Sequence, residues 1–365
     1  MPVSQHNPSL IIGVQLRKAR ELLSLRREEV AQELDVSPHE IKDWEKGTSQ
    51  PSLQQLETLA SLYGREIDYF LRETPNPPTA IAFRGKPGES LRSLSNETRA
   101  VLARFDELCR SAVEFEGLLH KKREIKLATI PARETARTGA HRIRKQYDLE
   151  DKPITDLRAL LEDAGVRIFE IPIPNDELSG FSFWHEKYGP CILVHAKDVK
   201  GRRNFTLAHE LAHLLYSHGS SACYIPQKII EVHQRMEQKA NQFAVELLLP
   251  ITGVVDDFKK RNLPKKPSEK QLRQMSFKWR VSSQALGYRL EGLGLISAGL
   301  TNKMIERKPF LRRPKTPAWE RRLGKRFVGT SIEAYRKNLI SVGKLAHALQ
   351  IPIRKAMEIA ETGAR

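Results

Sequence analysis

The sequence predicts an α+β protein that is mostly helical and built from several domains. Apolar residues recur at helical spacing in most segments of the chain. With 365 residues, the chain is also too long for one ordinary hydrophobic core. Changes in composition and charge separate four expected regions. They are an N-terminal domain (1–75), a linker with connecting helices (76–128), a central domain with a small sheet (129–300) and a basic helical C-terminal region (301–365).

The composition favours a cytoplasmic protein without membrane contact. No apolar run approaches the roughly 18 residues that span a bilayer, and the polar N-terminus lacks the core of a signal peptide. The three cysteines are widely spaced and odd in number. This pattern argues against a disulfide framework and for a reducing compartment.

The N-terminal region is typical of a helix-turn-helix domain. Ser37 is a suitable N-cap, and Pro38 fits the first position of the helix that ends at Gly47. The pattern A-x-x-L-x-V-S-x-x-x-I-x-x-W-E-x-G resembles the Xre/Cro repressor family, in which the third helix lies in the major groove. Five helices are expected, at 11–22, 28–34, 38–46, 51–63 and 66–71.

The charge of this domain leaves its partner open. Residues 1–75 hold nine Lys/Arg and twelve Asp/Glu, a net charge of −3. On the third helix, Glu40 and Asp43 would face phosphates unfavourably, whereas His39 and Lys42 would favour them. DNA binding and docking of a protein partner are therefore both retained as hypotheses.

A linker and connecting helices are expected between the domains. Residues 75–88 are rich in proline and glycine, as linkers are. Residues 94–123 carry apolar side chains at helical spacing and are interpreted as one or two helices. Pairing of these helices in a homodimer is one role that we consider.

The strongest chemical signal is His209-Glu210-Leu211-Ala212-His213, which has the form H-E-x-x-H on a helix-forming background. Four-residue spacing places the two histidines on one helical face, where they can bind a single metal ion. Glu210 lies about 100° around the helix from His209 and can act as a general base. The motif predicts a zinc hydrolase. The alternative is an amphipathic helix with two hydrogen-bonded histidines.

A catalytic zinc site needs a third protein ligand, and the next helical stretch offers two carboxylates. Glu237 is preferred, because Glu246 lies among apolar residues and is more typical of a helix surface. Asn241 would share the helical face of Glu237 and could hold the outer N–H of a histidine. Pro250 is expected to end this helix. Zinc is the default for His/His/Glu ligation, and manganese stays open.

These segments resemble the ImmA/IrrE family of metallopeptidases. The resemblance rests on residues 203–213 and 237–250, and segments within 153–195 resemble the helix and strands that precede the family's metal helix. It implies a zincin-like, gluzincin-type domain with a small sheet. It also implies zinc bound by His209, His213 and Glu237, with Glu210 as the catalytic base.

Two further features of a peptidase site remain open in the sequence. An oxyanion could be stabilised by Tyr216, His218 or Tyr224, and packing is an equal alternative for each. The strand around residues 192–194 is a candidate edge on which a substrate could add as a strand.

The C-terminal region carries most of the positive charge. Residues 301–365 contribute a net charge of +11 to the +17 of the whole chain. Basic pairs alternate with Phe310, Trp319 and Phe327, a pattern that suits contact with nucleic acid. A solvated basic linker is the alternative, and three short helices are expected after residue 330. The candidate DNA- or partner-binding cations of this region are Arg312, Arg313, Arg321 and Arg322.

Two functions from different classes follow. The resemblance implies a regulatory endopeptidase that cleaves a transcriptional repressor of the helix-turn-helix type in response to stress, DNA damage or phage. The alternative is a DNA-binding regulator or antitoxin, in which the metal domain serves sensing or structure. Glu210 favours the first hypothesis, because a purely structural metal site needs no general base.

Overall fold

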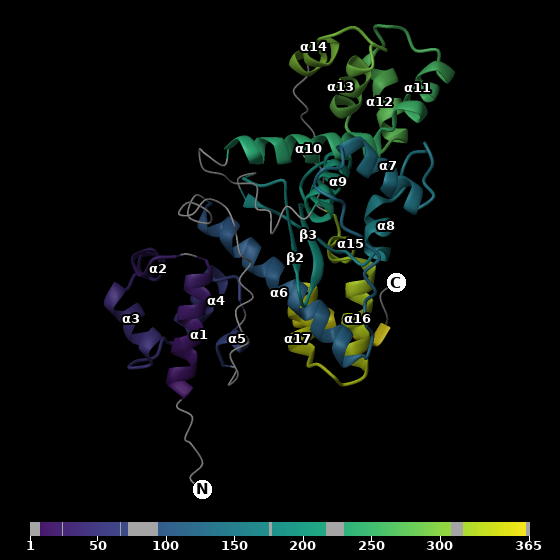
Figure 1. Ribbon diagram of the computed structural model, residues 1–365. Coiled ribbons are helices and arrows are strands. Elements are labelled where there is room, and N and C mark those ends of the chain that lie inside the picture. Colours follow the sequence, from purple (N-terminus) through teal and green to yellow (C-terminus); the bar gives the residue numbers. More distant parts are fainter. Residues whose placement is uncertain are drawn as a thin grey trace. The chain divides into compact units, whose positions relative to one another are not determined.

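The computed structural model describes residues 8–23, 25–65, 67–71, 94–174, 177–216, 230–307 and 317–362. It divides into two compact units, which are described separately (Figure 1). The first comprises Met1–Lys121, Ile173–Glu177 and Lys325–Arg365, and the second comprises Lys122–Pro172 and Leu178–Gly324. Helices dominate both units, and the described strands form one three-stranded sheet. The predicted α+β class is therefore confirmed.

Five helices at the start of the first unit form the helix-turn-helix domain. They are α1 (Pro8–Leu22), α2 (Arg27–Leu34), α3 (Pro38–Lys46), α4 (Leu53–Leu62) and α5 (Ile67–Leu71). The Ser37 side chain caps α3, and Gly47 ends it in the left-handed conformation at φ 73°. Glu45 of α3 is buried and pairs with Arg20 of α1 and Arg27 of α2. This ion cluster ties the first three helices together.

The predicted connecting segment is one helix, α6 (Asn96–Leu118), and it is buried within the first unit. It packs against α4 and α16 (Lys325–Arg336), and Phe115 stacks on Phe327 with 6.1 Å between ring centroids. Its apolar residues are thus used inside the chain, which removes the basis for the helix pairing in a homodimer. The unit ends with α17 (Val342–Leu349) and α18 (Ile353–Thr362).

The sheet of the second unit contains β1 (Arg167–Ile171), β2 (Gly180–His185) and β3 (Gly189–His195). The strand order is β1-β3-β2, with β3 parallel to β1 and antiparallel to β2. The prediction that residues 192–194 form an edge is therefore wrong, because β3 is the central strand. The edges are β1 and β2, and the short helix α15 (Trp319–Leu323) packs against β1.

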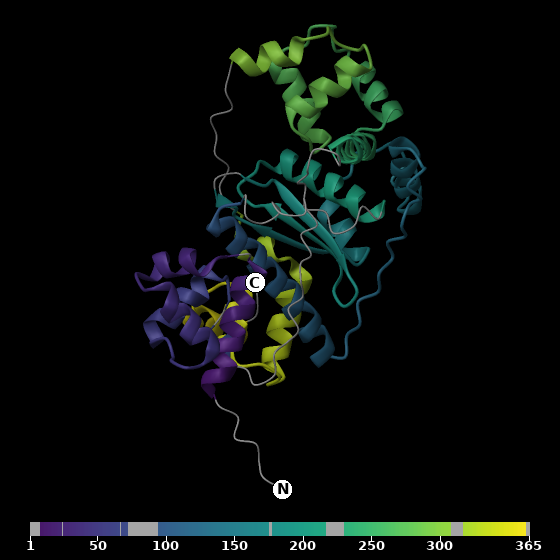
Figure 2. The same ribbon diagram turned by 60° about the vertical axis from the view of Figure 1, so that its left-hand side comes forward.

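Helices surround this sheet and complete the core of the second unit. Figure 2 shows α9 (Lys200–Leu215) lying across the sheet, where it contacts β2 and β3. Helix α10 (Ile230–Leu248) packs on α9 and on α7 (Ala136–Gln146), and it ends just before Pro250, as predicted. The remaining helices are α8 (Leu157–Asp163), α11 (Ile251–Lys260), α12 (Glu269–Lys278), α13 (Ser283–Gly292) and α14 (Leu300–Arg307).

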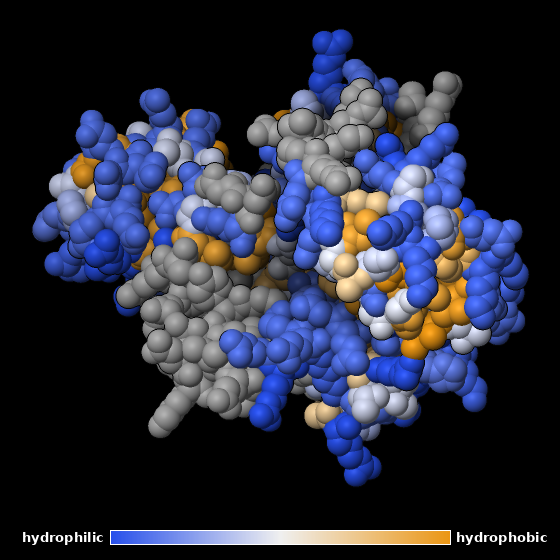
Figure 3. All heavy atoms as spheres, turned by 90° about the horizontal axis from the view of Figure 1, so that it is seen from above, coloured by the Kyte–Doolittle hydropathy of each residue, from blue (hydrophilic) through white to orange (hydrophobic). Residues whose placement is uncertain are grey.

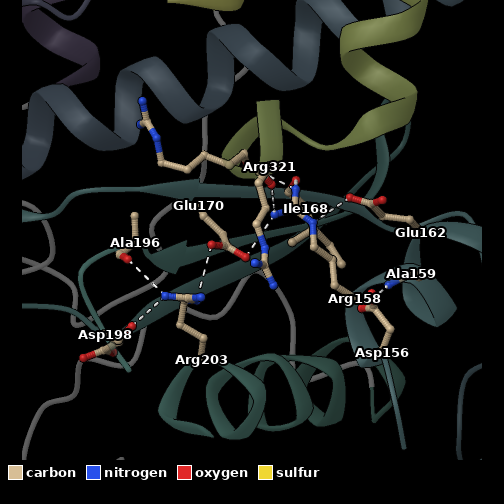
Figure 4. Close-up of polar contacts among 11 residues, drawn as sticks. Asp156, Arg158, Ala159, Glu162, Ile168, Glu170, Ala196, Asp198, Arg203 and Arg321 are labelled. Carbon is tan, nitrogen blue, oxygen red and sulfur yellow. Dashed lines mark hydrogen bonds and ion pairs between the residues drawn. The ribbon is translucent and has the colours of Figure 1, made fainter. Parts of the chain in front are cut away.

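A buried carboxylate, Glu170 of β1, joins three elements of this unit (Figure 4). Arg158 of α8 approaches its Oε1 at 3.0 Å, and Arg203 of α9 approaches its Oε2 at 3.3 Å. Arg158 also donates to the carbonyl oxygens of Arg321 and Arg322 in α15. The cluster therefore fixes the start of α9 and the position of α15 relative to the edge strand β1.

The face seen in Figure 3 is largely hydrophilic, and hydrophobic residues gather on it in patches, the clearest of them at the right of the view. One exposed hydrophobic side chain of the second unit is Phe277 of α12, which is 71% exposed and lies under the guanidinium of Arg280. Among the described residues, no helix combines the length and the apolar character that crossing a membrane requires.

Candidate metal centre

The H-E-x-x-H segment lies in α9, and the structure brings its two histidines together with Glu237 of α10. The Nε2 atoms of His209 and His213 are 3.1 Å apart. The Glu237 carboxylate bridges them, with Oε2 at 3.2 Å from His209 and Oε1 at 3.2 Å from His213. Three residues with potential ligand atoms, from two neighbouring helices, thus lie close together.

The spacing of these atoms fits a tetrahedral metal ion. Two zinc ligands at about 2.05 Å from the metal and at a tetrahedral angle lie about 3.3 Å from each other. The two imidazole nitrogens are 3.1 Å apart, in agreement with this value, and each lies 3.2 Å from one of the two oxygens of the Glu237 carboxylate. Two imidazoles and one carboxylate also match the ligand types of a catalytic zinc site, which leaves a fourth position open. The residues present therefore suit such an ion.

Asn241 lies where it can orient one of these histidines. Its Oδ1 is 3.0 Å from Nδ1 of His209, one helical turn after Glu237. A proton on Nδ1 leaves Nε2 unprotonated and free to bind a metal. Burial lowers the pKa of His209, but its hydrogen bond to Glu237 and nearby carboxylates outweigh burial and raise the pKa overall.

Glu210 is almost completely buried, and two residues of strand β2 lie beside its carboxylate. The hydroxyl of Ser182 donates to Oε2 of Glu210 at 2.6 Å. A Cβ atom at Gly180 would lie 3.0 Å from Oε1 of Glu210 and 2.4 Å from the Thr206 methyl group. Burial is the main reason that the pKa of Glu210 is raised.

The sequence did not identify Ser182. Its signal is weak: Ser182 and Gly180 are small residues on one face of a strand whose other face carries Phe181 and Phe183. Only the packing of α9 across β2 reveals that this small, polar face meets the carboxylate of Glu210.

The rival carboxylate Glu246 has a different partner. Both of its oxygens accept hydrogen bonds from the guanidinium of Arg289 in α13, at 3.1 and 2.8 Å. A bidentate pair of this kind satisfies the carboxylate and fixes α13 against the end of α10.

We expect Glu237→Ala to weaken binding of Zn²⁺ by about 100-fold or more, because two imidazoles remain where a catalytic site has three protein ligands. Competition with a chromogenic chelator measures this change. Glu246→Ala is the matched control, since it removes a carboxylate from the same helix whose partners are Arg289 and Arg137 and not the two histidines. Equal zinc affinity of the Glu237 variant and the wild type would contradict the proposed ligand set.

The candidate oxyanion donors are not supported by the described residues. The hydroxyl of Tyr216 donates to the carbonyl of Thr135 at 2.8 Å, and its ring packs edge-on against Phe243. Tyr216 is 3% exposed, so the structure gives it the packing role. His218 and Tyr224 lie outside the described residues.

Tyr216 should also affect stability at alkaline pH. Burial raises the pKa of Tyr216 to about 12, whereas the pKa of a tyrosine in an unfolded chain is about 10. The protonated Tyr216 contributes fully to the free energy of unfolding below about pH 10. This contribution is lost as the pH rises to about 12, because only the unfolded chain loses the proton between these two values. We expect Tyr216→Phe to reduce this alkaline loss by about 1 kcal/mol, with Tyr288→Phe as a control at an exposed tyrosine. Urea unfolding at pH 9 and pH 11 measures it.

The predicted DNA- or partner-binding residues have different surroundings. His39 and Lys42 are exposed on α3, and His39 pairs with Asp43 at 2.9 Å. Arg321 is exposed and its side chain points away from Glu170 in Figure 4. Arg312 and Arg313 lie outside the described residues, as does Phe310.

Two residues of the basic segment are less available than predicted. Arg322 is half-buried near Glu170, and burial lowers its pKa. Phe327 is buried against Phe115 and cannot stack on a base. The prediction of nucleic-acid contact is therefore wrong for Phe327, which is buried, and loses support for Arg322, which is half-buried.

Comparison with known families agrees with this architecture. Residues 16–70 match a family model described as helix-turn-helix. Residues 161–291 match the peptidase M78 model, described as the IrrE N-terminal-like domain. The chain therefore carries an Xre-type helix-turn-helix domain and an IrrE-like domain, as the resemblance predicted. No curated protein matches the sequence.

Proposed function

We propose that this chain is a metal-dependent regulatory endopeptidase that inactivates a helix-turn-helix repressor by cleaving it. The observation that carries the proposal is the convergence of His209, His213 and Glu237 beside a buried carboxylate, Glu210. The match to a peptidase model over the same residues supports hydrolysis of a peptide bond. The helix-turn-helix domain in the same chain supports a role in transcriptional regulation.

The roles of the residues follow from their positions. When bound by the three ligands, zinc supplies a Lewis acid that polarises a carbonyl and lowers the pKa of a water molecule. In this proposal Glu210 accepts a proton from the attacking water and returns it to the leaving amine. Asn241 holds His209 in the required tautomer.

Strand β2 is the edge at which we expect the substrate to bind. It is an edge strand, it contacts α9, and Ser182 of this strand touches Glu210. An extended peptide can pair its backbone with such an edge and so bring one peptide bond to the neighbouring site. The other edge, β1, is contacted by α15.

The direct test is cleavage under controlled metal content. The purified full chain is stripped with a chelator, reloaded with Zn²⁺ or Mn²⁺, and mixed with helix-turn-helix proteins encoded near it. We expect fragments of one such protein after metal is restored and none after chelation. If every candidate stays intact with both metals, the proposed function is wrong.

A DNA-binding regulator is the second candidate, and the exposed His39 and Lys42 on α3 support it. If α3 contacts phosphates, Lys42→Ala should weaken binding of duplex DNA and reduce the slope of log affinity against log salt by about 1. Fluorescence anisotropy at several salt concentrations measures both. An unchanged slope would place any DNA contact outside α3, and removal of residues 1–75 then tests the rest of this domain.

A further inference from the structure

Ser182 and Gly180 are neighbours on one face of β2, and both meet side chains of α9. The two positions are separated by one residue, so their side chains point to the same face of the strand. Ser182 is 1% exposed and Glu210 is 2% exposed, so their contact is shielded from water. A charged or strongly polar group in such a place needs a hydrogen-bond partner within the protein.

The contact between Ser182 and Glu210 is short and specific. The hydroxyl oxygen of Ser182 lies 2.6 Å from Oε2 of Glu210, and it also lies 3.3 Å from the Glu210 backbone carbonyl. A hydroxyl has only one proton, and the 2.6 Å distance indicates that this proton is donated to the carboxylate. The hydroxyl of Ser182 therefore fixes Oε2 of Glu210, whereas Oε1 of the same carboxylate receives no hydrogen bond from Ser182.

Gly180 limits where that second oxygen can lie. A Cβ atom at this position would come within 3.0 Å of Oε1 and within 3.2 Å of the Glu210 Cγ. The same atom would come within 2.4 Å of the Thr206 methyl group, which lies one turn earlier on α9. The absence of a side chain at Gly180 thus gives the carboxylate its space, and the helix its close approach to the strand.

From these contacts we infer that Ser182 is a positioning residue for the general base, and that Gly180 supplies the space in which the base is held. The inference rests on the proposed function, since a base has to be positioned only if the site hydrolyses a bond. Strand β2 would then serve the site in two ways: one face orients Glu210, and its outer edge in the described sheet is where the substrate is expected to pair.

The first experiment compares Ser182→Ala with the wild type at equal zinc content. We expect kcat for repressor cleavage to fall about 10-fold or more with KM nearly unchanged, because the ligands and the substrate edge remain while the base loses its orientation. Ser182→Cys, a weaker donor of similar size, should lie between the two. Ser276→Ala is the matched control: Ser276 is also a buried, hydrogen-bonded serine of the second unit. An unchanged kcat of Ser182→Ala would overturn the inference, and so would a weaker zinc affinity measured separately by chelator competition, since that would place the effect on the ligands.

The second experiment needs no catalysis. In the metal-free full chain, thermal unfolding is measured for Ser182→Ala, Glu210→Ala and the double variant. We expect Ser182→Ala to lower the Tm by about 3–6 °C when Glu210 is present and by about 1 °C or less when residue 210 is Ala. Equal losses in both backgrounds would overturn the inference, because Ser182 would then support the strand and not the carboxylate. If this coupling is found while the wild type cleaves nothing, the contact stands and the proposed function alone fails.

Discussion

Glu210→Gln is expected to reduce repressor cleavage by about 10²–10⁴-fold while zinc stays bound, because a neutral amide cannot accept the proton that the reaction releases. Gln has nearly the shape of Glu, and its carbonyl oxygen can still accept the hydrogen bond from Ser182. The ligands His209 and His213 are not changed. The variant should therefore fold and bind metal but fail in the chemical step.

Initial rates of fragment formation at matched metal content measure this effect. Glu186→Gln makes the same chemical change at an exposed position of the same unit and serves as the control. The same pair distinguishes the two proposed functions in cells. If Glu210→Gln and the wild type regulate transcription equally, cleavage is not the function and a DNA-binding regulator is favoured.

The cluster of candidate metal ligands could be predicted because helical spacing is a local property. His209 and His213 are four residues apart, so any helix over this segment places them on one face. Glu237 and Asn241 are also four residues apart, and the structure puts them beside His209. The packing of α9 against α10 is a tertiary property. A single metal site needs ligands from both helices, so the predicted site also predicted that the two helices lie together.

Features that depend on tertiary packing were not predictable in the same way. The apolar run 191–195 is compatible with either an edge strand or a central strand. Only the pairing of β1 and β2 on its two sides shows that it is central. Ser182 lies 28 residues before Glu210, and no spacing rule links a serine on a strand to a helix that crosses it. Phe327 follows a basic segment, but its environment is decided by Phe115, more than 200 residues earlier in the sequence.

The same limitation applies to charge. The sequence assigned Arg321 and Arg322 to a basic surface, because ten Lys/Arg lie between residues 303 and 326. The structure uses the backbone of both residues to accept hydrogen bonds from Arg158, and it half-buries Arg322 near Glu170. Net charge predicts partners only for side chains that reach the surface.

Glu170→Ala is expected to destabilise the second unit by about 3–5 kcal/mol, because it removes the carboxylate from a buried group of arginines. Burial lowers the pKa of Arg203 and of Arg322, and the Glu170 charge opposes this in both. Without that charge, the guanidinium groups of Arg158 and Arg203 would face each other in a site that excludes water. A decrease in Tm of about 6–15 °C should result.

Three comparisons separate the causes of this loss. Glu170→Gln keeps the shape and one acceptor oxygen but turns an amide N–H donor toward one of the two arginines, so its loss reports the charge together with one lost acceptor. Glu162→Ala removes the other carboxylate that pairs with Arg158, but this carboxylate is 18% exposed and α8 can rearrange around it, so a smaller loss is expected. Added phosphate should raise the Tm of Glu170→Ala more than that of the wild type, because an anion can occupy the place of the carboxylate. A Tm within about 2 °C of the wild type for Glu170→Ala would show that the arginines are solvated and that the cluster does not hold α9 and α15 in place.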